Sequence, residues 1–203
     1  MEDFMKLTFF EAIEKRRSVY ALGKEKVVTE ARIKEIVETA VKHVPSPFNS
    51  QSGRAVVLFG KESSKFWSIT RETLRKIVPE AAFKATDEKI SSFDAGYGTV
   101  LFFEDQAVVE GLMSAYSLYK EKFPVWSLQS NGMIEFAVWT ALEAEGLGAS
   151  LQHYDPLVEA EVKKNWQLPE KWKLLAEMPF GSVTVPAGVK EFSPLESRIK
   201  VFG

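Results

Sequence analysis

The sequence predicts an α+β fold in which helices surround a small central mixed sheet. Three observations favour this class: amphipathic helical segments alternate with short, continuous apolar segments, the chain begins with helices, and no linker divides it. A doubly wound nucleotide-binding fold is disfavoured, because its phosphate-binding turn follows an initial strand. The 12 Gly and 9 Pro are scattered along the chain, so residues 1–203 are predicted to form one domain.

Two helices are predicted near the N-terminus. Thr8 and Glu11 have the spacing of a capping box, and they begin a helix that extends to about residue 17. A second helix begins after Thr29, because the apolar residues that follow recur with the spacing of one helical face. These residues are Ile33, Ile36, Val37, Ala40, Val41 and Val44. Two prolines directly after Val44 end this helix.

The middle of the chain is predicted to contain two strands and three helices. Residues 55–59 and 98–103 are short apolar segments of the kind that forms buried strands, and the first is expected to be buried on both faces. Residues 63–78, 106–121 and 130–145 are expected to be helical. The third of these helices is apolar nearly all round, so we expect it to lie in a core or a subunit interface.

The C-terminal third is predicted to contain two more strands and an extended arm. Gly146 follows the apolar helix where a left-handed cap is required. Residues 149–153 and 172–180 are predicted strands, and between them Asp155-Pro156 is typical of an N-cap followed by the first residue of a helix. Residues 181–203 have turn residues and charge but little periodicity, and are expected to form a C-terminal arm.

Composition excludes several classes of protein. The net charge of −2 and the pI near 5.9 give no basic face for nucleic acid. The chain has no cysteine, which excludes a disulfide scaffold, a thiolate zinc site, an iron–sulfur cluster and a cysteine nucleophile. Residues 1–6 lack the pattern of a signal peptide, and charged residues interrupt every apolar stretch before the roughly 20 residues of a membrane span. We therefore expect a cytoplasmic protein without a membrane partner.

Familiar catalytic motifs are missing from the sequence. It contains neither G-x-G-x-x-G nor a P-loop, and no Ser/His/Asp triad is indicated. His43 and His153 lie far apart along the chain, so no metal site is predicted on them. We therefore expect no catalytic side chain of the hydrolase type and no metal.

Four polar clusters instead lie at the ends of predicted elements. They comprise residues 16–18, residues 45–52, Gln152-His153, and the basic residues of the arm, which are Lys190, Arg198 and Lys200. Each has an ordinary structural interpretation, such as a solvated helix end or a turn-rich loop. Amides and hydroxyls on a proline-stiffened loop also suit a planar polar ligand, and ligands gather beyond the carboxyl ends of strands in α/β proteins.

The order of these clusters resembles that of the nitroreductase family of FMN-dependent oxidoreductases. The resemblance rests on residues 9–18, 45–51, 98–105, 146–154 and 179–181. Within it, the Pro-Ser-x-x-Asn-Ser-Gln pattern of residues 45–51 is the most telling for the family. The segments Gly-Thr-x-Leu-Phe-Phe-Glu-Asp and Leu-Gln-His-Tyr point to the branch named for a fatty-acid-repression mutant.

The resemblance implies a sandwich-shaped homodimer with exchanged C-terminal arms and one FMN in each of two interface sites. Arg16 and Ser18 would hold the phosphate and ribityl chain, with Arg17 near the pyrimidine side and Arg198 or Lys190 closing over the phosphate. The partner subunit would contribute the residues of the polar loop, which are Pro45, Ser46, Pro47 and Asn49, with Gln51 in a structural role. The backbone of Leu151, Gln152 and His153 would face the flavin ring.

Some positions keep two interpretations. Phe48 and Trp126 are expected either to cover a substrate cleft or to pack in the interior, whereas Trp139 is expected to pack in the core or interface. A mid-chain contact to FMN would come from Lys84 or Lys89. No carboxylate stands beside Gln152-His153, where the best-known family members have one near the flavin N5, so the group that bonds N5 stays open.

The resemblance also implies a reaction carried by the cofactor. NADH or NADPH would reduce the flavin, and a nitroaromatic or quinone acceptor would then reoxidise it, in a ping-pong scheme that needs no catalytic acid. The alternative is a flavin-binding regulatory or stress-response protein, in lipid or redox signalling, with only incidental reductase activity. A third interpretation, a helical binding protein without cofactor, leaves the polar clusters unexplained.

Overall fold

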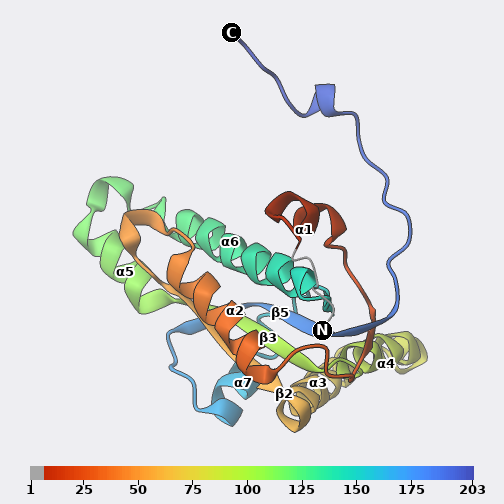
Figure 1. Cartoon of the computed structure of the whole chain (residues 1–203). Helices are drawn as coiled ribbons and strands as arrows, with labels where there is room; N and C mark the ends of the chain where they lie inside the picture. Colours follow the sequence, from red (N-terminus) through yellow and green to blue (C-terminus); the bar gives the residue numbers. More distant parts are fainter. Residues whose placement is uncertain (1–6) are drawn as a thin grey trace.

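An antiparallel sheet lies between two layers of helices (Figure 1). The computed structural model describes residues 7–203, so the expectation that residues 1–6 are no signal peptide lies outside the described residues. The strands are β1 (Ala21–Gly23), β2 (Gly53–Phe59), β3 (Gly98–Asp105), β4 (Gly148–Ala149) and β5 (Trp172–Val185). Their order is β1-β5-β3-β2, and β4 also pairs with β5. The pairs among these strands are antiparallel, and the parallel component is a bridge between Ser18 and Ala149.

The described residues form seven α-helices, and the predicted α+β class is confirmed. They are α1 (Phe9–Lys15), α2 (Glu30–His43), α3 (Gly60–Arg75), α4 (Glu80–Asp94), α5 (Gln106–Ala115), α6 (Phe123–Ala144) and α7 (Glu159–Trp166). Short 3-10 turns follow as η1 (Pro47–Asn49), η2 (Ser117–Tyr119) and η3 (Leu195–Ser197). The capping box of α1 is confirmed, because Thr8 and Glu11 exchange hydrogen bonds through both side chains. In residues 7–203, no helix is long and apolar enough to cross a membrane.

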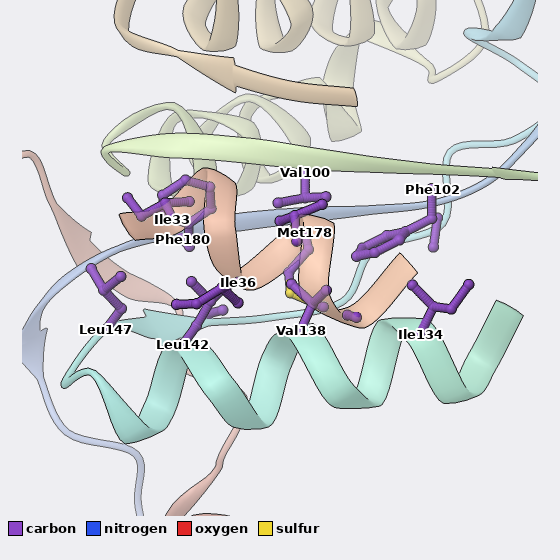
Figure 2. Packing of buried hydrophobic residues seen from close by; sticks show 14 residues of the cluster. Ile33, Ile36, Val100, Phe102, Ile134, Val138, Leu142, Leu147, Met178 and Phe180 are labelled. Atoms are coloured by element: carbon purple, nitrogen blue, oxygen red, sulfur yellow. The ribbon is translucent and has the colours of Figure 1, made fainter. Parts of the chain in front are cut away.

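Alternating side chains of the central strands create two cores. Val100 and Phe102 of β3 face α2 and α6, whereas Leu101 and Phe103 pack in the second core with residues of α3, α4 and α7. In Figure 2 the side chains of Ile134, Val138 and Leu142 point from α6 toward the sheet and α2. Strand β3 is therefore buried on both faces, which confirms the buried strand predicted at residues 98–103.

Several strand predictions need correction. Strand β2 is not buried on both faces: residues 54–57 are half-buried, because β2 is an edge strand whose pairing, within residues 7–203, is to β3 alone. The predicted strand 149–153 is reduced to β4 and a bridge between Gln152 and Glu177. Strand β5 continues to Val185, because residues 182–185 pair with β1, a strand that was not predicted. The arm accordingly starts at residue 186.

The helix predictions also need correction. Helix α4 was not predicted, because polar Thr86 and Asp87 interrupt the apolar spacing between its buried residues Phe83 and Ile90. Helix α5 ends at residue 115, and α6 begins earlier than predicted, with Pro124 in its first turn. Helix α7 starts at residue 159 rather than at the Asp155-Pro156 pair, because residues 155–158 form a turn that buries Val158 in the second core.

Candidate functional site

A cationic cavity lies where the chain leaves α1 and where the C-terminal arm begins. Its volume is about 570 Å³. Arg16, Arg17 and Ser18 line one side, Tyr20 and Ala21 continue it, and residues 185–190, which include Lys190, line the other. Among the described residues that line it, three side chains are cationic and none is a carboxylate. Such a cavity attracts anions.

Arg16 is held at this cavity with unused hydrogen-bonding capacity. Its guanidinium lies 4.4 Å from the centre of the Trp139 ring of α6, a cation–π contact. Its Nε atom is buried and has no hydrogen-bond partner in residues 7–203. Burial lowers the pKa of Arg16 below its ordinary value, although the nearby Glu143 acts in the opposite direction. A charged donor without a partner is suited to bind an anion.

The segment containing Leu151, Gln152 and His153 follows Ala149, which pairs with the cavity residue Ser18, although none of the three residues lines the cavity itself. Ser18 forms a bridge with Ala149, and the backbone N–H of Val19 donates to the carbonyl of Ala149 at 2.9 Å. Leu151 packs partly against the first core, the Gln152 side chain is buried and bonds Ser150, and His153 is exposed. The structure therefore brings together two of the predicted polar clusters and Lys190.

The loop of residues 45–51 is a strained structure at the other end of α6. Phe48, Asn49 and Gln51 have φ angles of 56°, 52° and 49°, a region that side-chain-bearing residues rarely adopt. The Gln51 N–H donates to the Ser46 hydroxyl at 2.9 Å, and the Ser130 hydroxyl of α6 donates to the Pro45 carbonyl at 2.9 Å. Such strain is commonly found at functional sites. The backbone of Gln51 thus closes the loop onto Ser46.

Phe48 and Trp126 belong to one cluster of aromatic rings. The Phe48 ring lies 4.7 Å from that of Tyr116 and 5.4 Å from that of Phe123, between ring centres. Trp126 contacts the same Phe123 at 5.4 Å and Tyr119 at 5.8 Å. Phe48 is 52% exposed, so its ring faces solvent as well as the cluster. Both expected functions, covering a cleft and packing, remain compatible with this position.

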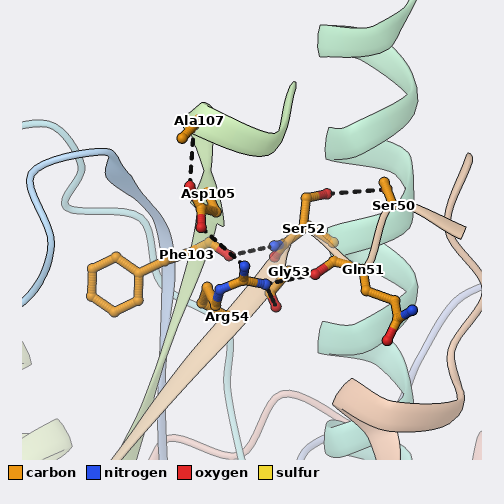
Figure 3. A network of polar contacts seen from close by, with 9 residues as sticks. Ser50, Gln51, Ser52, Gly53, Arg54, Phe103, Asp105 and Ala107 are labelled. Atoms are coloured by element: carbon orange, nitrogen blue, oxygen red, sulfur yellow. Dashed lines mark hydrogen bonds and ion pairs between the residues drawn. The ribbon is translucent and has the colours of Figure 1, made fainter. Parts of the chain in front are cut away.

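A polar network connects the end of the loop of residues 45–51 to strands β2 and β3 (Figure 3). Arg54 donates to the Gln51 carbonyl at 2.6 Å and forms an ion pair with Asp105 at 2.9 Å. Beside it, the buried Asn131 amide donates to the Phe103 carbonyl at 2.9 Å and to the Glu104 carboxyl at 3.0 Å. Glu104 is fully buried, and burial raises its pKa above the ordinary value.

The loop and the cationic cavity do not meet within one chain. Ser130, which contacts the loop, and Trp139, which contacts Arg16, are nine residues apart on α6, or about 14 Å along its axis. Pro45, Ser46, Pro47 and Asn49 therefore lie away from Arg16, as a contribution from a partner subunit would require.

Three other predicted residues lie outside the cavity. Lys84 and Lys89 are exposed on α4, and neither is among the residues that line the cavity. Arg198 follows η3 on the arm and does not line it either.

Two further residues gain importance: Trp139, which stacks on Arg16, and Glu177, which pairs with Gln152. The signal for Glu177 was an acidic residue within an apolar strand. No group of three metal-ligating side chains occurs in the part of the chain that the structure describes.

Comparison with known proteins gives consistent matches. The sequence model of the family described as "Nitroreductase family" matches residues 13–182. The nitroreductase FRM2 of Saccharomyces cerevisiae is 32% identical over 186 residues, which cover 91% of this chain and 92% of FRM2.

Solved structures agree. The nitroreductase CinD of Lactococcus lactis, in complex with nicotinic acid, is 45% identical with a TM-score of 0.89, covering 97% of this chain and 100% of CinD. Other CinD structures hold chloramphenicol or 4-nitrophenol. A protein of the same fold from Desulfovibrio desulfuricans, in complex with FMN, is 18% identical with a TM-score of 0.70, covering 98% of this chain and 100% of that chain.

The network below the loop leads to a prediction about stability. Replacing Asn131 by alanine leaves the Phe103 carbonyl and the Glu104 carboxyl without this donor. We expect the free energy of unfolding to fall by about 1–3 kcal/mol, the cost of unsatisfied buried acceptors, as measured by urea denaturation. Asn165→Ala is the matched control, because the Asn165 amide bonds the Glu161 carbonyl on an exposed surface. Equal effects of the two variants would contradict a supporting role for Asn131.

Proposed function

The chain belongs to the nitroreductase family of oxidoreductases, and on that premise we propose that it uses FMN and NADH or NADPH to reduce nitroaromatic or quinone-type acceptors in a ping-pong reaction. The predicted family is confirmed, as is its branch, because FRM2 denotes the fatty-acid-repression mutant. The observation that carries the proposal is the cavity at Arg16, Arg17 and Lys190.

The residues at this cavity fit FMN. Its volume lies within the range of small-molecule sites, and its cations suit a phosphate group. The buried Nε of Arg16 offers a donor that no described residue uses. Support also comes from the FMN in the Desulfovibrio desulfuricans protein of this fold.

Each group of residues would have a separate task. Arg16, Arg17 and Ser18 bind the phosphate and ribityl chain, and Lys190 closes over them from the arm. The backbone of residues 151–153 lies against the ring. The chemistry that FMN supplies when bound is hydride transfer, from the nicotinamide and then to the acceptor. Phe48 and Trp126 offer aromatic surface to planar acceptors. The nicotinic acid, chloramphenicol and 4-nitrophenol held by CinD are aromatic compounds of suitable shape.

The second half of each site would come from a second copy of the chain. Helix α6 leaves Val125, Leu128, Met133 and Phe136 between 39% and 51% exposed, which is unusual for a long apolar helix. The arm extends away from the rest of the chain (Figure 1), and its Val189, Phe192 and Phe202 are 75–98% exposed.

The edge of β2 offers a place for such an arm. A groove of about 450 Å³ runs beside it, lined by the apolar residues Ala55, Val57 and Phe59 of β2 and by residues of α2 that include three charged ones. Edge strands bind extended segments through their free backbone groups. A homodimer with exchanged arms would cover these surfaces and bring the loop of residues 45–51 to the partner's cavity.

The reductase activity is tested by visible spectroscopy of the purified protein. We expect flavin absorption bands, either as purified or after addition of FMN, and bleaching of these bands by NADH or NADPH without air. A subsequent addition of 4-nitrophenol or a quinone should restore the bands. A protein that takes up no FMN contradicts the proposal. If FMN binds but neither nicotinamide reduces it, the regulatory alternative is favoured.

Arg16→Ala should weaken FMN binding. Losing charge-assisted hydrogen bonds to a phosphate costs about 1.5–3 kcal/mol, so the dissociation constant should increase roughly 10- to 150-fold in a fluorescence titration. Lys84→Ala and Lys89→Ala are the controls, because both lysines are exposed on α4 and outside the cavity. An unchanged affinity of Arg16→Ala would refute the phosphate assignment, and a loss in Lys84→Ala or Lys89→Ala would restore that lysine as a contact.

Asn49→Ala should act on the site of the other subunit. In mixed dimers of an Arg16→Ala chain and an Asn49→Ala chain, both substitutions fall in one site and the second site is intact. We therefore expect half of the sites to bind FMN with wild-type affinity, measured by titration of differently tagged, co-purified dimers. If Arg16 and Asn49 served the same chain's site, every site would carry one substitution and none would have wild-type affinity.

A further inference from the structure

Glu177 is a carboxyl residue in the middle of the buried strand β5. Its side chain is fully buried, at 0% exposure. Its backbone carbonyl accepts from the N–H of Gln152 at 2.7 Å, and its own N–H donates to the Gln152 carbonyl at 2.9 Å. Its Oε2 atom accepts from the backbone N–H of Tyr154 at 2.9 Å. One residue thus holds the segment Gln152–Tyr154 with three hydrogen bonds.

The surroundings of Glu177 favour its uncharged form. Its second oxygen, Oε1, is buried without a hydrogen-bond partner in residues 7–203. The charged groups that act on it are Asp155, in the turn after Tyr154, and Glu135, on α6. Both are carboxyl groups, so neither compensates a negative charge. Burial is the main cause that raises the pKa of Glu177 to about 8; Asp155 and Glu135 act in the same direction, and the hydrogen bond from the Tyr154 N–H acts against them.

We propose that Glu177 is a positioning residue for the cofactor: its protonated side chain holds Gln152–Tyr154 in the conformation that the site requires, and loss of the proton in alkaline solution releases this segment. The role toward FMN rests on the proposed function, because residues 151–153 are its expected ring contacts. The hydrogen bonds to the segment do not depend on it.

Charge burial gives the physical reason for the release. A buried carboxylate without a cation is costly, and the single N–H of Tyr154 does not offset this cost, so the ionised side chain turns toward water and leaves Tyr154. The pKa of Glu177 in the folded protein lies above its ordinary value of 4.5. The contribution of the protonated Glu177 side chain to the free energy of unfolding is therefore complete at pH below 4.5 and is lost as the pH rises through about 8. The backbone amide of Tyr154 reports the ionisation most directly, because its N–H donates to the titrating carboxyl group itself.

The first test is the backbone amide of Tyr154, followed by NMR in the full ¹⁵N-labelled chain without cofactor. In the wild type we expect its chemical shift to titrate with a midpoint near the pKa of about 8, and its hydrogen exchange to exceed the ordinary base-catalysed increase above that pH. In Glu177→Gln both effects should be lost, because the amide keeps an acceptor for Tyr154 but cannot ionise. Glu135→Gln is the matched control, and it should keep the titration with a slightly lower midpoint. A flat wild-type profile, or the same titration in Glu177→Gln, overturns the proposal.

The second test is FMN affinity in the wild type and Glu177→Gln. Binding that requires the protonated form of a group with pKa about 8 should weaken about tenfold between pH 7 and pH 9. Dividing the dissociation constant of the wild type by that of Glu177→Gln at the same pH cancels the effect of the ionisation of FMN itself. A ratio that does not change with pH overturns the positioning role, even if the proposed function stands. If the wild type binds no FMN at any pH, the proposed function fails, and the Tyr154 titration still decides whether Glu177 holds the segment.

Discussion

The backbone pairing of β5 is the constraint on which the rest of the structure depends. A buried strand needs a partner for nearly every N–H and C=O group, and β5 finds them in β3, β4 and β1 in turn, with Gln152 as a further bridge. Ser18 bridges Ala149 of β4, and β4 pairs with β5, so the end of α1 is connected to β5 through β4. Beyond Val185, β5 continues into the arm that lines the cavity. One strand therefore sets the relative positions of Arg16, the Gln152 segment and Lys190.

Helix α6 sets the separation between the loop of residues 45–51 and the cavity at Arg16. It supports the strained loop through Ser130 and stacks Trp139 against Arg16. A helix of 22 residues packed on the sheet cannot shorten to bring its two ends together. This spacing is the reason why we propose that another chain supplies the second half of each site. The same helix that fills the core would thus also space the two halves.

The sequence predicts those parts of the fold whose physical signal is local. Helix α2 is predicted because its apolar residues keep one helical period, and strand β3 because its apolar residues form one continuous segment. Helix α4 was missed because polar residues break that period, and β1 because three residues carry too little pattern. Within the site, the sequence singled out Arg16 and Lys190, but not their approach in space, which the pairing of β1 with β5 decides. Burial of Glu177 likewise depends on neighbours distant in sequence.

The free edge of β2 and the exposed apolar side chains of the arm link the stability of this protein to its concentration. A sheet edge without a partner in the described chain is a template for any extended segment, including those of other unfolded proteins. If a second copy covers it, as we propose, dilution removes that protection and acts as a mild denaturant. The midpoint of thermal unfolding would then rise with protein concentration.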